Sequence, residues 1–216
     1  MSGPPAPAVV RPMEAGDLPT VDRVFRLAFG TYLGMPDPSR FAGDSDLVGT
    51  RFEADPGGAI VAEMDGEVVG SCFATCWGAL GFFGPLTVRP DLWDRGIAHA
   101  LLAETNALFD RRGVRVRGLY TFAQSAKHVR LYQRFGYWPR FLNATLSGPV
   151  SPSGADFETL PSAPGADALA EVRAVADALF PGLDPSREIA SVAAQELGDT
   201  VLVRRATGEL EGYAIV

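Results

Sequence analysis

The residues best placed to do chemistry lie in the stretch LTVRPDLWDRGIAHALL, residues 86–102. Leu86 and Val88 predict a strand, and Gly96 opens a helix whose apolar residues recur with a period of 3.6. A helix start leaves backbone N–H groups unpaired and carries partial positive charge. Because Gly96 and Ala98 have almost no side chain, a phosphate group can approach those amides. The stretch is a candidate pyrophosphate cradle, although a strand, turn and helix with one glycine is common in any α/β domain.

A second stretch, SAKHVRLYQRFGYWP at residues 125–139, adds side chains that can move protons. Ser125 is a suitable cap for a short helix, and Gly136 ends it. His128 lies one helical turn before Tyr132, so the two are expected on one side. By position alone, Tyr132 is a core aromatic, and a single helical histidine is usually a surface or packing residue.

The two stretches together resemble the acetyl-CoA-dependent N-acetyltransferase superfamily known as GNAT. Its central motif, a strand ending V-x-P and then Q/R-x-x-G-x-G/A followed by L-L, is matched by Val88, Pro90, Gly96, Ala98, Leu101 and Leu102. Its later motif, N-x-x-A-x-x-L-Y-x-x-x-G-F/Y, is matched by Leu131, Tyr132, Gly136 and Tyr137. Three positions depart from the pattern: Trp93, Ser125 and His128. The resemblance covers roughly residues 8–148, and two motifs at the right spacing are more specific than either alone.

The resemblance implies an α/β (α+β) fold. We expect a mixed, mostly antiparallel central sheet flanked by helices, with residues 79–88 and 114–123 as a splayed pair of parallel strands. It also implies an enzyme that transfers an acetyl group from acetyl-CoA to a primary amine, without a metal. The acceptor is open: small amines, amino sugars, peptides and protein N-termini all remain. A CoA-binding domain without catalysis, acting as a sensor or as half of an assembly, is the alternative.

Roles for individual residues follow from the same resemblance. The Val88 N–H is expected to donate to the thioester carbonyl as negative charge develops there. Tyr132 is expected to protonate the departing thiolate, because a phenol and a thiol of similar basicity are well matched. The residues expected to bind the cofactor are Leu86, Thr87, Val88, Asp94, Arg95, Gly96, Ile97, Ala98, Ser125 and Lys127. Here Trp93 replaces the usual Gln or Arg, so backbone amides carry more of the phosphate contact.

The general base is not evident from the sequence. Many GNAT relatives carry a carboxylate on the strand before the cradle, but residues 79–88 contain none. Glu14, Glu63, an acid from residues 37–46 or a chain of water molecules remain as alternatives. Phe82 and Phe83 occupy the strand instead, either lining an acceptor pocket or packing in the core.

Composition limits the remaining function classes. The chain has 216 residues and a formal net charge of −7, which argues against nucleic acid. No apolar run reaches the length of a membrane span. Cys72 and Cys76 form no disulfide framework and a poor metal site, and a cytosolic setting fits them. Lys127 is the only lysine among many arginines, a bias that suggests a GC-rich bacterial genome.

The chain order suits the expected sheet. A first strand over residues 8–14 precedes a helix from Leu18 that Asp17 is expected to cap, and a second helix near residues 46–52. Strands are expected at 59–64 and 67–77, with Asp65-Gly66 as a strong hairpin turn between them. A last strand is expected at residues 140–147.

The end of the chain repeats its beginning. Residues 59–70 match residues 201–212 at one constant offset, so that Gly66, Glu67 and Gly70 align with Gly208, Glu209 and Gly212. We therefore expect a GNAT domain at 1–148, a linker at 149–166 and a partial second unit at 167–216, either truncated or a remnant. Its last strand leaves an apolar edge, which packing on the first unit or homodimer formation would cover.

Overall fold

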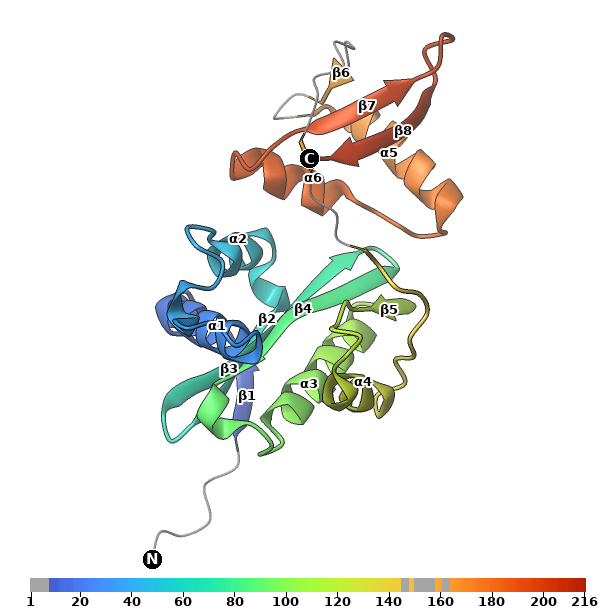
Figure 1. Cartoon of the computed structure of the whole chain (residues 1–216). Coiled ribbons are helices and arrows are strands. Elements are labelled where there is room, and N and C mark those ends of the chain that lie inside the picture. The colour runs from blue at the N-terminus through green and yellow to red at the C-terminus, as the bar shows by residue number, and fades with distance from the viewer. Residues whose placement is uncertain (1–7, 145–147, 150–157, 161–163) are drawn as a thin grey trace, which may run out of the picture. The chain divides into compact units, whose positions relative to one another are not determined.

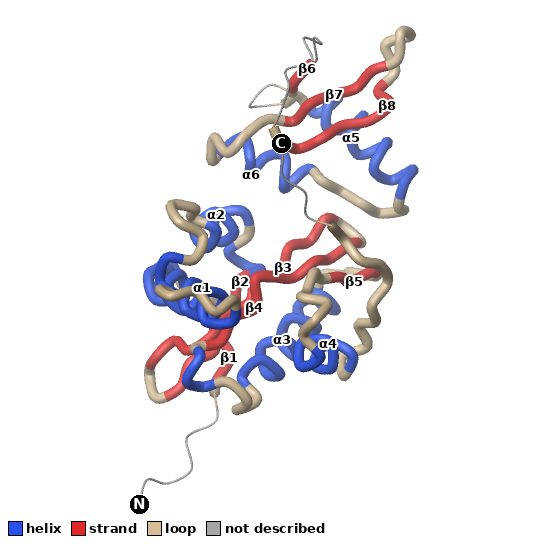
Figure 2. Tube along the Cα trace, viewed as in Figure 1, coloured by secondary structure: helices blue, strands red, loops and turns tan. Residues whose placement is uncertain are grey.

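The computed structural model describes residues 8–144, 148–149, 158–160 and 164–216. The chain divides into two compact units, Met1–Tyr120 and Thr121–Val216, and each is described by itself. Figure 1 shows the elements of both units, and Figure 2 separates their helices from their strands.

The first unit is built on a five-stranded sheet. Its strands are β1 (Val9–Pro12), β2 (Ala59–Met64), β3 (Glu67–Trp77), β4 (Leu80–Val88) and β5 (Val116–Gly118). They lie in the order β1-β2-β3-β4-β5, and only the pair β4–β5 is parallel. This mixed, mostly antiparallel sheet confirms the predicted fold class. Asp65 and Gly66 form the β2–β3 turn with φ of 53° and 80°, as their sequence predicts.

Helices cover both faces of this sheet (Figure 2). On one face lie α1 (Leu18–Tyr32) and α2 (Leu47–Ala54), and on the other lies α3 (Ile97–Arg111). The face under α1 and α2 holds a core of Met13, Val21, Phe25, Val48, Ala59, Val61 and Phe73. The helix expected from Asp17 is confirmed, but its carboxylate binds Arg11 and the Glu14 N–H instead of capping α1.

The helix α3 approaches the sheet closely at two glycines. A Cβ added to Gly81 would lie 2.7 Å from the Phe109 ring and from Val114. A Cβ added to Gly70 would lie 2.7 Å from the carbonyl oxygen of Thr87 and 3.2 Å from Leu101 Cδ1. The apolar stripe predicted for this helix is buried against these positions, so β3 and β4 are held directly beneath α3.

Two predicted strands differ from the structure. The strand expected at 114–123 is only Val116–Gly118, and Tyr120 beyond it is 72% exposed. The strand expected at 140–147 does not form over Arg140–Ala144, which are exposed loop residues, and residues 145–147 lie outside the described residues. Alternating apolar residues predicted the strand at 114–123, and the chain order of the unit suggested the one at 140–147, but a strand also needs a neighbouring strand to receive its hydrogen bonds.

The second unit combines α4 (Ala126–Gln133) with a small sheet and two further helices. The sheet has the order β6-β7-β8, with β6 at Glu158–Thr159, β7 at Thr200–Arg204 and β8 at Leu210–Ile215. The helices α5 (Ala166–Leu179) and α6 (Ser186–Ala194) supply Val172 and Ile189 to a core with Leu160, Leu202 and Leu210. No helix in the described part of the chain is long and apolar enough to cross a membrane.

The second sheet repeats the topology of the first three strands of the first sheet. In both, a strand precedes two helices and an antiparallel hairpin, and the first strand pairs with the hairpin's first strand. Both hairpins also carry a bulge beside equivalent glycines. The register shifts after Ala62↔Gly70 in the first hairpin and after Val203↔Gly212 in the second. The identity of residues 167–216 as a partial GNAT unit stays a prediction, as do the domain boundaries.

The paired glycines give a stability test. Gly70→Ala should destabilise the first unit by about 1–3 kcal/mol, because the methyl group enters space already filled by Thr87 and Leu101. Gly212→Ala is the matched control, since a Cβ there meets no atom within 4 Å. We expect it to change stability by less than about 0.5 kcal/mol in urea denaturation. Equal losses in both variants would contradict the close packing of α3 on β3.

Candidate functional site

One edge of β4 carries backbone groups that pair with no strand among the described residues. The Arg89 N–H donates to the Val69 carbonyl of β3 at 2.8 Å, and Val88 stands opposite Gly70. Because N–H groups alternate along a strand, the N–H of Val88 points away from β3. The described part of β5 pairs with β4 only from Leu80 to Phe82. The edge at residues 86–88 therefore presents its outward N–H groups to a ligand.

The turn after β4 is tied back to the strand by Trp93. Its indole Nε1 donates to the carbonyl oxygen of Val88 at 2.8 Å. Its backbone N–H donates to the Pro90 carbonyl and closes the 3-10 turn Pro90–Leu92. The outward carbonyl of Val88 thus has a partner, and its outward N–H remains the group directed at a ligand. Trp93, at the position where the GNAT motif usually has Gln or Arg, holds the turn against the end of β4.

The turn then adopts two left-handed residues before α3 begins. Asp94 has φ of 65° and Gly96 has φ of 82°, and a Cβ at Gly96 would meet no atom within 4 Å. Gly96 is the N-cap of α3 and has no side chain to cap it. The first bond of the helix runs from the Ala100 N–H to the Gly96 carbonyl, so the N–H groups of Ile97 and Ala98 precede it. These open amides at the positive end of α3 fit a phosphate group.

Charged side chains around the turn divide into bound and exposed groups. Arg89 donates to Asp91 and to Glu67, each at 2.9 Å, and these carboxylates raise the pKa of its guanidinium. Arg95 is exposed in the turn itself. Arg95 is accordingly the cation best placed to add charge to a phosphate at the start of α3.

The structure brings together Leu86, Thr87, Val88, Asp94, Arg95, Gly96, Ile97 and Ala98 within the first unit. Thr87 differs from its neighbours because its hydroxyl is buried and shares a hydrogen bond of 2.9 Å with Ser71 Oγ. Its backbone also faces β3, since Val88 faces outward. The cofactor contact expected of Thr87 stays a prediction, and the outward groups belong to Leu86 and Val88.

Ser125, Lys127 and Tyr132 belong to the second unit. Ser125 is the N-cap of α4, as predicted, and its buried Oγ accepts the N–H of His128 at 3.4 Å. Lys127 is exposed and Tyr132 is half-buried. Burial, and then the charge of Lys127, lower the pKa of His128, which favours a neutral imidazole. The site roles expected of these residues stay predictions.

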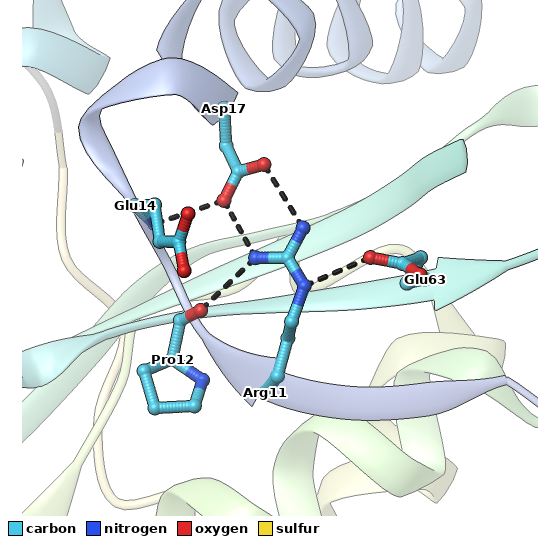
Figure 3. A network of polar contacts seen from close by, with 5 residues as sticks. All are labelled: Arg11, Pro12, Glu14, Asp17 and Glu63. Atoms are coloured by element: carbon cyan, nitrogen blue, oxygen red, sulfur yellow. Dashed lines mark hydrogen bonds and ion pairs between the residues drawn. The ribbon is translucent and has the colours of Figure 1, made fainter. Parts of the chain in front are cut away.

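Two of the candidate bases lie away from the open edge. Arg11 binds Glu63 at 2.8 Å through Nε and Asp17 at 2.7 Å and 3.0 Å through its terminal nitrogens (Figure 3). The guanidinium lowers the pKa of Asp17. Glu14 follows β1, which is three strand spacings of about 4.8 Å from β4. The Arg11 network therefore joins β1, β2 and the start of α1. Its carboxylates bind Arg11 and so stabilise the fold.

Two of the three acids of residues 37–46 have local partners, and the third, Asp44, is exposed. Asp37 accepts the N–H of Ser39 at 3.1 Å, and Asp46 caps α2 through the N–H of Gly49 at 2.8 Å. These bonds explain the two aspartates as helix caps. Among the residues that the structure describes, no cluster of three His, Cys, Asp or Glu side chains is arranged to hold a metal ion.

Comparisons with known proteins agree with the fold of the first unit. Residues 55–139 match the family model of the acetyltransferase (GNAT) domain. No curated protein sequence matches the chain. A Pyrococcus horikoshii crystal structure, assigned as an acetyltransferase, aligns with a TM-score of 0.65 and 17% identity over 97% of this chain and 67% of its own.

Two further structures were solved with coenzyme A groups. The PaiA N-acetyltransferase of Thermoplasma acidophilum, in complex with coenzyme A, has a TM-score of 0.52 and 18% identity over 60% of this chain and 89% of its own. The structure of AAC(6')-Iy with a CoA bisubstrate analogue has a TM-score of 0.50 and 16% identity, over 68% of this chain and 100% of its own. Structural similarity at sequence identities this low establishes the fold alone.

The Trp93 bond can be tested without any ligand. Trp93→Phe keeps a ring but removes the N–H donor, so we expect a loss of about 1 kcal/mol in urea denaturation. Trp138→Phe is the control, because Trp138 is 67% exposed and its replacement should change little. In proton NMR, the Trp93 indole proton should exchange more slowly than that of Trp138. Equal exchange rates would show that the indole does not hold the end of β4.

Proposed function

We propose, from the premise that residues 55–139 are a GNAT acetyltransferase domain, that this acyltransferase moves an acetyl group from acetyl-CoA to a primary amine. The observation that supports the proposal most is the junction of two backbone sites. The open edge of β4 ends where the uncapped start of α3 begins, and Trp93 ties the two together. An extended pantetheine arm and a pyrophosphate need these two kinds of site in this order.

The residues present fit acetyl-CoA. The outward groups of Leu86 and Val88 suit an arm that pairs as an additional strand. The amides of Ile97 and Ala98, with Arg95 beside them, suit the pyrophosphate. When bound, acetyl-CoA supplies an acetyl group activated as a thioester. The Val88 N–H supplies a fixed donor for the carbonyl oxygen, on which negative charge develops in the transition state.

The reaction balances with one proton moved. The neutral amine nitrogen forms a bond to the thioester carbon, the carbon–sulfur bond breaks, and the nitrogen loses a proton. The thiolate takes a proton from Tyr132, a role that we assign from its match to the second GNAT motif, and the tyrosinate then regains a proton from water, so that the net transfer is one proton from the amine to the thiol. Water is the proposed proton acceptor for the amine, since Glu63 is bound to Arg11 and the aspartates at 37 and 46 cap helices; among the acids of residues 37–46, Asp44 stays the alternative.

The pyrophosphate site at the start of α3 is tested by placing a negative charge at Gly96. Gly96→Glu should abolish CoA binding, which we expect in the micromolar range by calorimetry, because its carboxylate would face the phosphates. Gly113→Glu is a matched control: Gly113 has φ of 69°, is open, and lies at the far end of α3. Fifteen residues of helix put about 22 Å between the two positions. Unchanged affinity in a folded Gly96→Glu protein would refute the cradle.

The role of Tyr132 as the proton donor is tested by removing its hydroxyl group. Tyr132→Phe should lower kcat by about 10²-fold while acetyl-CoA affinity stays near that of the native chain, because only the proton donor is lost. Tyr137→Phe, five residues later, controls for the removal of a half-buried phenol. Thiol release and calorimetry measure the two quantities. A parallel loss of binding and rate would give Tyr132 a packing role.

The same measurements separate the enzyme from a binding module. Tight CoA binding without thiol release from any amine would favour the non-catalytic alternative. The cytosolic setting, the bacterial source and a homodimer stay predictions.

A further inference from the structure

The carbonyl group of Val88 is bound by a side chain at the open edge of β4. The indole Nε1 of Trp93 donates to its oxygen at 2.8 Å. This carbonyl points away from β3, because the Arg89 N–H donates to the Val69 carbonyl and the backbone groups of a strand alternate between its two edges. The indole nitrogen therefore lies on the outer edge of β4, where a neighbouring strand would place its own N–H donor.

An arm that pairs with β4 as an additional strand needs both backbone groups of each outward residue. Each outward N–H donates to a carbonyl of the arm, and each outward carbonyl accepts an amide N–H from it. Leu86 and Val88 are the outward residues, and at Val88 the carbonyl is already bound to Trp93. A carbonyl oxygen has two lone pairs, but an added strand brings its donor to the edge on which the indole nitrogen lies. The arm and the indole thus compete for the same position.

Trp93 also lies on the path that the cofactor must follow. The thioester is expected at Val88, and the pyrophosphate is expected at the first amides of α3. Trp93 comes between them in the sequence, and its side chain folds back to the strand. The 3-10 turn keeps its shape without the indole, because the backbone N–H of Trp93 donates to the Pro90 carbonyl at 3.3 Å. Since the side chain is half-buried, it can leave the edge while the turn stays closed.

We propose that the indole of Trp93 is a latch that the cofactor arm displaces. In the free protein the indole N–H holds the Val88 carbonyl. On binding, an amide N–H of the pantetheine arm takes that carbonyl and the indole turns out of the edge. The bound cofactor then joins the turn to β4, because it contacts both. The inference rests on the proposed use of acetyl-CoA and names a further residue that controls binding at the same site. The native indole weakens CoA binding, because one hydrogen bond has to break before another can form.

Calorimetry with three ligands tests the latch. CoA contains the arm and the nucleotide, pantetheine contains only the arm, and ADP contains only a nucleotide with its pyrophosphate. Trp93→Phe keeps a ring but has no N–H to displace. We expect this variant to bind CoA and pantetheine about 5-fold more tightly than the native chain, the factor that corresponds to one hydrogen bond of about 1 kcal/mol. ADP should bind both proteins equally. A CoA affinity that is unchanged or weaker in Trp93→Phe would overturn the proposal.

Proton exchange at the indole tests the same step in the native chain. In the free protein, the Trp93 indole proton should exchange more slowly than that of Trp138, which is 67% exposed. Saturating CoA should remove this protection, whereas ADP should leave it in place. The Trp93 signal is identified by its absence from the spectrum of Trp93→Phe. Trp138→Phe is the matched control, and its affinity for CoA should equal that of the native chain. Protection that persists in the CoA complex would show that the indole keeps the carbonyl and would refute the latch.

The outcomes also separate the latch from the function on which it rests. Equal CoA affinity in the native and Trp93→Phe chains, with an indole proton that stays protected, would keep the cofactor and reject the latch. No CoA binding by either chain would reject both. Tighter CoA binding by Trp93→Phe, together with loss of indole protection in the native complex, supports both.

Discussion

The parallel pairing of β4 with β5 lasts for three residues, and the proposed chemistry depends on that short length. Leu80, Gly81 and Phe82 pair with β5, and β4 then continues to Val88 without a parallel neighbour in the described part of the chain. The register against β3 shifts at Gly84–Pro85, where Pro85 has no N–H to give to a neighbouring strand. A bulge of this kind bends a strand. It therefore gives β4 a physical reason to leave β5 at this point.

An open strand edge has to be held in place by other contacts. On one side, β3 pairs with β4 on both sides of the bulge. Above the sheet, α3 rests on Gly70 and Gly81, where no Cβ would fit. At the end, Trp93 binds the Val88 carbonyl. These contacts fix the backbone groups before any ligand arrives, which is the condition for effective stabilisation of developing charge.

The sequence predicted best those elements whose signals are local. Asp65-Gly66 identified the first hairpin, and the glycines at both ends of α3 marked its limits. The strand at 114–123 was predicted too long because its apolar alternation is local, whereas its pairing depends on where β4 bends. The strand expected at 140–147 does not form over residues 140–144, which pair with no strand in the described residues.

In the candidate site, too, the features predicted from the sequence depend on neighbouring residues, and those not predicted depend on partners elsewhere in the fold. The small residues Gly96 and Ala98 predicted the cradle because an open helix start needs only their backbone. The role of Trp93 was not predictable, since its partner is a carbonyl group and carbonyl groups are present at every position. Glu63 was considered as a base, but Arg11, 52 residues earlier, takes its carboxylate. Phe82 and Phe83 were considered for an acceptor pocket or for the core: Phe83 is buried, whereas Phe82 is half-buried.

The missing cap at Gly96 has a thermodynamic consequence. A helix that starts with a serine or aspartate completes its own first turn, whereas α3 leaves its first N–H groups to whatever anion binds them. Any such ligand binds the folded state alone, so it raises the free energy of unfolding by an amount that grows with the logarithm of its concentration. At a hundred times the dissociation constant the gain is about 2.7 kcal/mol. The lifetime of the folded chain in a cell would then follow the size of the pool of that ligand, so that protein abundance and ligand supply are coupled without any regulatory partner.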